Sequence, residues 1–141
     1  MPTRTASAVW NGNLKEGNGD FKGASGAIQG KYSFGTRFES GKGTNPEELI
    51  AAAHAGCFSM ALSAQLGAAN ITPQGVETIA ALSLEKLDSG WTVTKVHLDV
   101  TATIPGADKA VFDKAAQAAK EGCPISKLLK AEITMSAKLI G

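Results

Sequence analysis

Several features that would direct a chain of 141 residues toward nucleic acid or toward secretion are missing. The 14 basic and 13 acidic side chains are spread through the sequence and form no basic stripe, so nucleic-acid binding has little support. The first residues, Met-Pro-Thr-Arg-Thr, are not followed by an apolar run of the kind that marks a secretory signal. We therefore expect a cytoplasmic protein with no nucleic-acid partner.

Charged side chains are absent from residues 49–76, a stretch that is long enough to be checked as a membrane span. Nearly half of it is Ala, Gly and Ser, and it contains His54, Gln65, Asn70 and Pro73. A spanning helix needs about 20 predominantly apolar residues. We therefore expect a buried helix of a soluble protein and no membrane partner.

Cysteine and histidine are scarce, with only Cys57, Cys123, His54 and His97 in the chain. A structural disulfide is not expected in a reducing cytosol. Two buried and inert thiols are one interpretation, because free cysteine is among the most buried residue types. A zinc site has little support, since a His-x-x-Cys spacing and a lone second cysteine do not match the usual ligand pairs.

The pattern of hydrophobic residues and turns predicts a single α+β domain, residues 1–141, with an antiparallel sheet. Three short strands are expected at 6–10, 20–24 and 27–33, followed by a glycine-containing loop at 34–43. Alternating residues predict further strands at 82–87, 96–104 and 133–139. Helices are expected at 46–70 and from Asp108 to about Glu121, with a short helical turn after Cys123.

The long helix has a well-marked start, because Asn45 suits the N-cap, Pro46 the first helical position and Glu48 the capping pattern. Small and apolar residues cover it on all sides, so it should be buried on all sides. A chain of this size cannot easily cover such a helix by itself. We therefore expect a partner subunit, most simply in a two-fold dimer.

Cys57 lies in the middle of this helix, and His54 lies three positions earlier on the same face. A contact between them would favour the thiolate, which is the nucleophilic form of cysteine. The alternative, which we favour, is that His54 only packs or forms a hydrogen bond, because no neighbouring group would orient the imidazole. Cys123 lies in Gly-Cys-Pro between two elements, and its distance along the chain leaves open whether the two sulfurs meet.

Arg37 lies in the glycine-containing loop and has two interpretations. It is either a solvated surface charge or a cation that stabilises a nearby thiolate. In the second case, Glu47 could hold the guanidinium in a bidentate pair. A favourable interaction with the helix dipole explains Glu47 equally well, since it lies in the first helical turn.

Two motifs resemble the OsmC/Ohr family of hydroperoxide reductases. Residues 43–62, which include His-Ala-Gly-Cys-Phe-Ser-Met around Cys57, resemble the helix of that family. Residues 122–134, which begin Gly-Cys-Pro-Ile-Ser-Lys-Leu-Leu-Lys, resemble its second motif. The resemblance extends over nearly the whole chain, and both motifs are more similar to the osmotically inducible OsmC branch than to the Ohr branch.

The resemblance implies an OsmC-like fold, in which an intertwined homodimer has two active sites at its interface. It also implies a peroxiredoxin-type oxidoreductase that takes part in the response to oxidative and osmotic stress. By match of position, Cys57 would be the peroxidatic thiolate, Cys123 the resolving thiol, and Arg37 and Glu47 the charged pair that activates Cys57. The Ohr branch has no histidine three residues before its cysteine, which weakens a catalytic role for His54.

Helix geometry limits how Glu47 can contribute to a site at Cys57. Ten residues of α-helix rise about 15 Å and turn through roughly 1,000°, so the two side chains lie on different faces. If both serve one site, Glu47 must come from the partner subunit. Antiparallel packing of two such helices across a two-fold axis would allow this arrangement.

The implied reaction needs no metal, haem or flavin. Cys57 would reduce the peroxide and become a sulfenic acid, which would condense with Cys123 to a disulfide. An external dithiol, which the resemblance suggests is of the lipoyl type, would reduce that disulfide. Organic hydroperoxides would be preferred to hydrogen peroxide if the apolar neighbours of Cys57 in sequence line the site. These neighbours are Ile50, Ala53, Phe58 and Met60.

Two other functions would use the same thiols. A non-catalytic redox sensor or ligand-binding stress protein would be oxidised stoichiometrically, without continued consumption of peroxide. A purely structural stress protein would have thiols that resist peroxide in the folded state. The amount of peroxide consumed per chain, with and without a dithiol, distinguishes the three.

Overall fold

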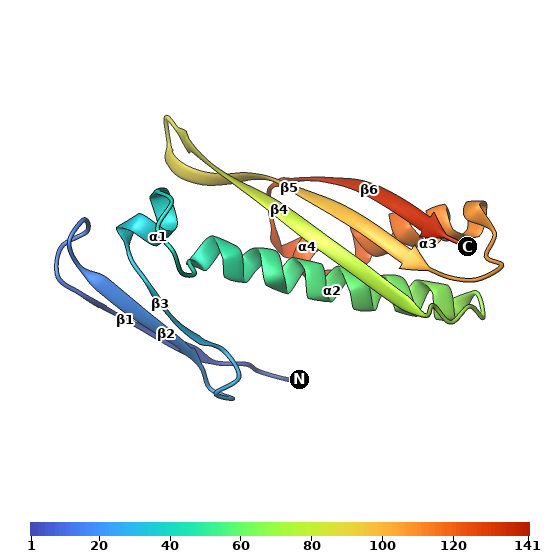
Figure 1. Cartoon of the computed structure of the whole chain (residues 1–141), viewed down its shortest axis with the longest axis horizontal. Helices are drawn as coiled ribbons and strands as arrows, with labels where there is room; N and C mark the ends of the chain where they lie inside the picture. Colours follow the sequence, from blue (N-terminus) through green and yellow to red (C-terminus); the bar gives the residue numbers. More distant parts are fainter. The chain divides into compact units, whose positions relative to one another are not determined.

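Turn signals and short alternating stretches in the first third of the chain form a small antiparallel sheet. Its strands, in the order β1-β2-β3, are β1 (Ala6–Asn11), β2 (Asn18–Gly23) and β3 (Gln29–Tyr32) (Figure 1). In the central strand, Gly19 is paired with Trp10 on one side and Tyr32 on the other. A Cβ atom at Gly19 would lie 2.7 Å from both aromatic side chains, so only glycine fits between them. The three predicted strands are confirmed.

A short helix, α1 (Phe34–Phe38), occupies the first half of the segment that the sequence predicts to be a loop. The Ser33 hydroxyl accepts a hydrogen bond from the backbone N–H of Thr36, and the Thr36 hydroxyl accepts one from the backbone N–H of Ser33. This reciprocal cap stabilises the first helical turn despite the nearby glycines. The loop prediction is therefore wrong for these five residues.

The long helix α2 (Pro46–Ala68) begins where the sequence predicts. The Asn45 side chain accepts a hydrogen bond of 2.7 Å from the backbone N–H of Glu48, which confirms the predicted cap. At the other end, Asn70 has a left-handed backbone with a φ of 60°. The N–H of Ile71 donates to the carbonyl of Leu66, which closes the last turn.

A second sheet follows, with the strand order β4-β5-β6. Its elements in chain order are β4 (Gly75–Leu87), β5 (Gly90–Thr103), α3 (Lys109–Gly122), α4 (Pro124–Leu128) and β6 (Glu132–Ile140) (Figure 1). β4 and β5 are antiparallel as predicted, whereas β6 runs parallel to β5. The prediction of a purely antiparallel sheet is wrong here, because the chain reaches β6 through a helical crossover, which returns the next strand in the parallel sense. The α+β class is confirmed.

The core around this second sheet is built from α2, β5 and α3. Its buried members include Phe58, Leu62, Leu66, Val96, Leu98, Val100, Ala102, Phe112, Ala115, Ala116 and Ala119. The spacing of four residues between the three core residues of α2 places them along one side of that helix. α2 therefore packs against the core through this one side. This packing fixes which way the neighbouring side chains of the helix point.

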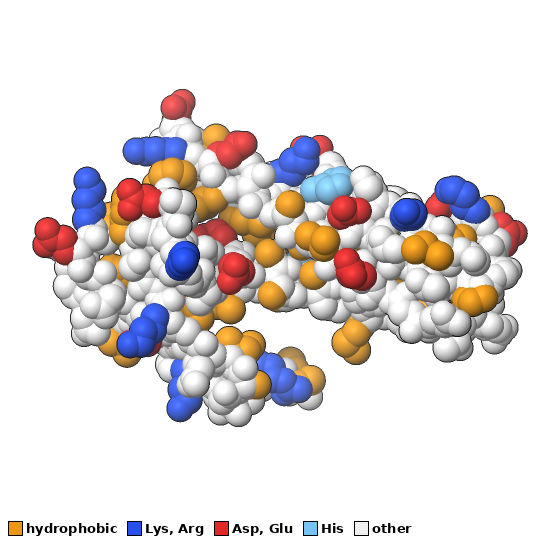
Figure 2. Space-filling model, viewed as in Figure 1, with side chains coloured by type: hydrophobic (Ala, Val, Ile, Leu, Met, Phe, Trp, Pro, Cys, Tyr) orange, Lys and Arg blue, Asp and Glu red, His pale blue; other side chains and the backbone are white.

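The opposite side of α2 is open within one chain. By length and composition the helix is a candidate membrane span, as core helices of soluble proteins also are, yet only 22% of its apolar stretch is buried. Its exposed residues are mostly small and include Ala52, Ala53, Gly56, Ala64 and Gly67. Hydrophobic side chains also lie exposed among charged ones on the surface shown in Figure 2. Within one chain α2 is buried on one face only, and its burial on all sides by a partner subunit stays a prediction.

The structure, a computed structural model, describes residues 1–141 as two compact units, Met1–Leu49 and Ile50–Gly141. The boundary lies in the first turn of α2. The first unit contains Arg37 and Glu47, and the second contains both cysteines. The assignment of residues 1–141 to one domain stays a prediction.

Candidate functional site

The two cysteines meet in the second unit. The Cys123 thiol donates a hydrogen bond to Cys57, with 2.7 Å between the sulfur atoms, although 66 positions separate them in the sequence. Both are free thiols, Cys57 half-buried and Cys123 fully buried. The contact that the sequence leaves open is therefore present, and it links the middle of α2 to the junction between α3 and α4.

Backbone geometry holds Cys123 at that junction. Its N–H donates to the carbonyl of Ala119, which ends α3, and its own carbonyl accepts from the N–H of Lys127 in α4. Pro124 opens α4, and the Cys123 backbone has a ψ of 125°, in agreement with the restriction that a following proline imposes. Cys123 is therefore the hinge residue between two helices and not a member of either.

The surroundings of Cys57 act on its ionisation in opposite directions. Burial raises the pKa of the Cys57 thiol, and the hydrogen bond with Cys123 raises it further. A hydrogen bond from the backbone N–H of Ile125 lowers it. The net pKa is above the usual value for cysteine, so within this chain the thiol form is favoured. A thiolate nucleophile requires a further positive charge.

His54 does not supply that charge. Its Nε2 atom lies 2.7 Å from the Ser126 hydroxyl oxygen, and its Nδ1 atom is buried without a hydrogen-bond partner. Burial lowers the pKa of His54, which favours the neutral ring. The interpretation of His54 as a hydrogen-bonding residue is thus in agreement with the structure, and its partner lies on α4.

Arg37 and Glu47 form the bidentate pair expected from the sequence, within the first unit. Nε and Nη2 of Arg37 donate to the two carboxylate oxygens of Glu47 at 2.8 and 3.0 Å. This hydrogen bonding raises the pKa of Arg37 further. Asn45 connects the two helices that carry the pair, because it caps α2 and its amide donates to the carbonyl of Thr36 in α1 at 2.8 Å.

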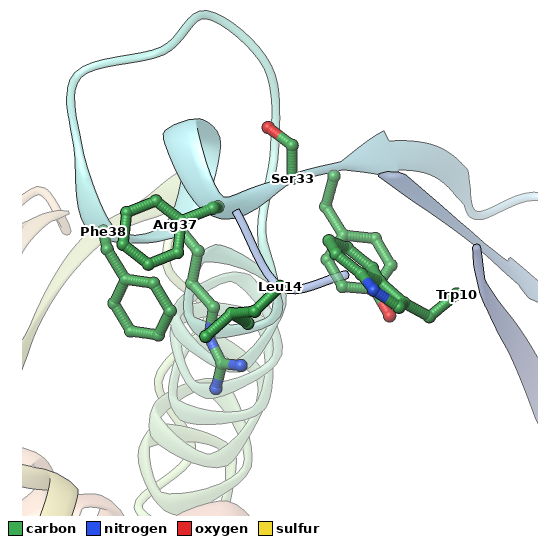
Figure 3. Close-up of a pocket in the computed structure, with 7 residues that line it drawn as sticks. Trp10, Leu14, Ser33, Arg37 and Phe38 are labelled. Atoms are coloured by element: carbon green, nitrogen blue, oxygen red, sulfur yellow. The ribbon is translucent and has the colours of Figure 1, made fainter. Parts of the chain in front are cut away.

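An apolar pocket of about 210 Å³ adjoins Arg37 in the first unit. Its lining residues are Trp10, Leu14, Tyr32, Ser33, Phe34, Arg37 and Phe38. Figure 3 shows Arg37 next to Phe38, with Leu14 between them and Trp10. The guanidinium carbon lies 5.1 Å from the centre of the Phe38 ring, close enough for a cation–π contact. The pocket offers one positive group among aromatic and aliphatic walls.

Comparison with known proteins identifies the family. The sequence model of the OsmC family, described as OsmC-like protein, matches residues 39–138. Peroxiredoxin OsmC of Escherichia coli (strain K12) is 50% identical over 137 residues, which cover 96% of each chain. The chain belongs to the OsmC family.

Solved structures have the same OsmC fold. An OsmC-like protein of unknown function from Vibrio cholerae superposes with a TM-score of 0.78 at 18% identity, over 97% of this chain and 99% of that one. The organic hydroperoxide resistance protein OhrB of Bacillus subtilis gives a TM-score of 0.69 at 25% identity, over 96% and 97% of the two chains. The OsmC-like fold inferred from the two motifs is confirmed.

The apolar neighbours of Cys57 differ in exposure within this OsmC-family chain, and their lining of the site stays a prediction. Phe58 is fully buried in the hydrophobic core. Met60 is 77% exposed, and Ala53 is exposed as well. A one-residue step along a helix turns the side chain by about 100°, so proximity in sequence to Cys57 is a poor guide to a shared surface.

The histidines and carboxylates of this OsmC-family chain do not gather into a metal site. No group of three or more His, Cys, Asp or Glu side chains is arranged to hold a metal ion. His97 is flanked on β6 by two hydroxyl groups, with Nδ1 2.6 Å from Thr134 and Nε2 3.1 Å from Ser136. Both ring nitrogens of His97 are thus hydrogen-bonded to side chains of the neighbouring strand.

Proposed function

We propose that this OsmC-family chain is a thiol-dependent peroxidase in which Cys57 is the peroxidatic cysteine and Cys123 resolves it. The observation that carries the proposal is the 2.7 Å contact between two free thiols from distant parts of the sequence. The 50% identity to Peroxiredoxin OsmC of E. coli supports the same chemistry. A role in the response to oxidative and osmotic stress in the cytoplasm is part of the proposal.

The reaction begins when the Cys57 thiolate attacks one peroxide oxygen. A sulfur–oxygen bond forms, the oxygen–oxygen bond breaks, and the other oxygen leaves as an alcohol or water after taking a proton. The Cys123 sulfur then attacks the sulfenic sulfur of Cys57 and releases water, which forms the disulfide. A dithiol, for which we propose the lipoyl class, returns both cysteines to thiols by exchange. These steps use only sulfur chemistry.

Activation of Cys57 is assigned to the Arg37–Glu47 pair of a second subunit. The elevated pKa of Cys57 calls for a nearby cation. Because Arg37 is bonded to Glu47 of its own chain, both side chains must come from the same subunit. Glu47 precedes Cys57 by ten residues on α2, about 15 Å along the axis and on another face, so that subunit is the partner.

The open side of α2 supports a homodimer. Small residues such as Gly56 and Ala53 are exposed there, and a Cβ atom at Gly56 would meet nothing within 4 Å in its own chain. Small side chains let a second helix approach closely, and covering this apolar side would remove it from water. A two-fold axis through α2 would complete two equivalent sites at once.

Mixing an inactive variant with a slowed variant tests the shared site. Cys57→Ser and Arg37→Ala homodimers each lack one component in both sites, whereas a mixed dimer regains one complete site. After random exchange of equal amounts, we expect about a quarter of the wild-type peroxidase activity. If Arg37 acts on the Cys57 of its own chain, mixing restores nothing above the average of the two parents. Sedimentation of the mixture checks that dimers have formed.

The substrate class is assigned to organic hydroperoxides. The pocket beside Arg37 has aromatic and aliphatic walls that suit an organic group, while the guanidinium suits the polar peroxide end. Hydrogen peroxide has no group to fill this pocket and would react less well. The relatives named for organic hydroperoxide resistance agree with this preference.

Replacing Arg37 with alanine should slow the oxidation of Cys57 without unfolding the chain. The side chain is 37% exposed, so its removal leaves no large cavity. Without the cation the Cys57 pKa rises, and the thiolate fraction falls about tenfold for each unit of increase. The rate of Cys57 oxidation, measured against pH in single-turnover experiments, should therefore reach its midpoint at a higher pH than in the wild type.

The control for this variant is Arg37→Lys, which keeps the charge but loses the bidentate geometry toward Glu47. We expect its pH midpoint to lie between those of the wild type and Arg37→Ala. An unchanged midpoint in Arg37→Ala would remove Arg37 from the activation of Cys57. Unfolding curves measured in parallel separate this effect from loss of structure.

A further inference from the structure

Two side-chain contacts join α2 to the region of α4, and they are arranged symmetrically in the sequence. Cys57 contacts Cys123 at 2.7 Å, and His54 contacts Ser126 at 2.7 Å. His54 precedes Cys57 by three residues, and Ser126 follows Cys123 by three residues. Three residues amount to almost one helical turn, so the second contact lies one turn away from the first on each helix.

α4 is short and lies at the surface. It comprises only Pro124–Leu128, and its N-cap residue, Cys123, makes no side-chain capping hydrogen bond. Its last residue, Leu128, is 73% exposed, and none of its residues is buried. A helix of this length is not stable by itself in water. Its position therefore depends on contacts with its surroundings. These include the hydrogen bond from the Ile125 N–H to Cys57, the His54–Ser126 hydrogen bond and the packing of Leu129 against the core.

The His54 side chain of the His54–Ser126 hydrogen bond is unusually placed. His54 is the only polar or charged residue among the fully buried ones, and its Nδ1 atom has no partner. A buried polar group is costly unless it is hydrogen-bonded. Since one ring nitrogen is left unpaired, core packing alone would be served better by an apolar residue. The one hydrogen bond that the His54 ring does make is to the Ser126 hydroxyl on α4.

We propose that His54 and Ser126 are positioning residues that hold Cys123 against Cys57, and that they thereby direct the Cys57 sulfenic acid to the disulfide. This proposal rests on the peroxidase function proposed above. It adds which residues decide whether the oxidised Cys57 forms the disulfide. His54 does not touch the peroxide in this scheme, and it acts through the position of α4.

The sulfenic acid has two competing fates. In the first, the Cys123 sulfur attacks the Cys57 sulfur, the sulfur–sulfur bond forms, the sulfur–oxygen bond breaks, and hydroxide leaves as water with the Cys123 proton. In the second, another peroxide molecule transfers an oxygen atom to the sulfenic sulfur, which becomes sulfinic acid while that peroxide is reduced to an alcohol or water. The first rate depends on the position of Cys123, and the second on the peroxide concentration.

The test measures how Cys57 is divided between these two products. Wild type, Ser126→Ala and Ser126→Thr are treated with increasing concentrations of cumene hydroperoxide in the presence of a dithiol. Mass spectrometry then gives the fraction of Cys57 that has become sulfinic acid. We expect Ser126→Ala to reach half conversion at an about tenfold lower peroxide concentration than wild type, because Cys123 is less well positioned. Ser126→Thr keeps the hydroxyl and should return toward the wild-type value.

Two further variants control for general effects. Ser59→Ala removes a hydroxyl group that lies on α2, two residues from Cys57. This hydroxyl is hydrogen-bonded to Thr78 of β4 and not to α4. The variant should leave the division between the two products unchanged. His54→Gln should behave as Ser126→Ala does, and the double variant should add little to either single change.

The outcomes separate this proposal from the function on which it rests. If wild-type Cys57 is not oxidised by peroxide, the peroxidase proposal fails. If wild type forms the disulfide and Ser126→Ala gives the same sulfinic fraction at every peroxide concentration, the positioning role is wrong while the peroxidase remains. Failure of Ser126→Thr to restore the wild-type value would equally contradict a role for the hydroxyl.

Discussion

The Cys57→Ser variant should lose peroxide turnover by more than about a thousandfold, since removal of the nucleophile eliminates the covalent route. A serine hydroxyl is almost never ionised near neutral pH, and it does not attack a peroxide oxygen as a thiolate does. The measurement is the steady-state loss of an organic hydroperoxide with excess dithiol.

The fold should tolerate this change. Cys57 is half-buried, serine is nearly isosteric with cysteine, and its hydroxyl can still accept a hydrogen bond from Cys123. The unfolding transition should therefore remain close to that of wild type. Ser59→Ala, on the same helix, is the matched control and should keep full turnover. Persistent peroxidase activity in Cys57→Ser would show that another group carries out the reaction.

Cys123→Ser should reduce peroxide once per chain and then stop in the presence of a dithiol that does not itself react with sulfenic acid. Without the resolving sulfur, the oxidised Cys57 cannot form the internal disulfide, so the sulfenic acid accumulates. The burst should equal about one peroxide per chain, and a dimedone-type reagent should label Cys57. The rate of the burst should be similar to that of wild type.

A second measurement checks that the loss of turnover has the expected cause. Cys123 is fully buried, so its replacement by serine places a hydroxyl in the space of the thiol, and the unfolding midpoint must be compared with that of wild type. Continued turnover by a folded Cys123→Ser variant would mean that an external thiol resolves Cys57 directly, and Cys123 would lose its assigned role.

Local signals in the sequence predict the elements around the cysteines well. Asn45, Pro46 and Glu48 mark the start of α2, and the structure contains the Asn45 cap. Strict alternation locates β5, because a strand with one buried face needs apolar residues at every second position. Asp108 caps α3 through a hydrogen bond of 2.8 Å to the N–H of Ala110. Each of these features depends on residues that are close together in the chain.

Two features of the fold are less accessible from the sequence, one of them because it depends on distant residues. The parallel direction of β6 follows from the crossover through α3 and α4, which hydrophobic alternation does not report. The glycines around α1 favoured a loop, whereas the reciprocal Ser33 and Thr36 cap stabilises a helical turn. The Ser-x-x-Thr spacing before Arg37 was the signal that could have identified this helix.

Ser126 is the site residue that sequence reasoning missed. It lies within the second motif, but a serine in a short helical segment has no property that distinguishes it. Only the fold brings it to 2.7 Å from His54. The spacing offers a clue, because His54 and Ser126 lie at equal distances from the two cysteines. Once a contact between Cys57 and Cys123 is assumed, a second contact one turn away could be expected.

The amount of peroxide consumed per chain, with and without a dithiol, tests most directly whether the two cysteines form a catalytic pair. Without dithiol, wild type should consume about one peroxide per chain and stop as the Cys57–Cys123 disulfide. With excess dithiol, consumption should continue until the peroxide is exhausted. A value that stays near one despite a dithiol that reduces the disulfide would indicate a redox sensor. No consumption in either condition would indicate inert thiols and would contradict the peroxidase.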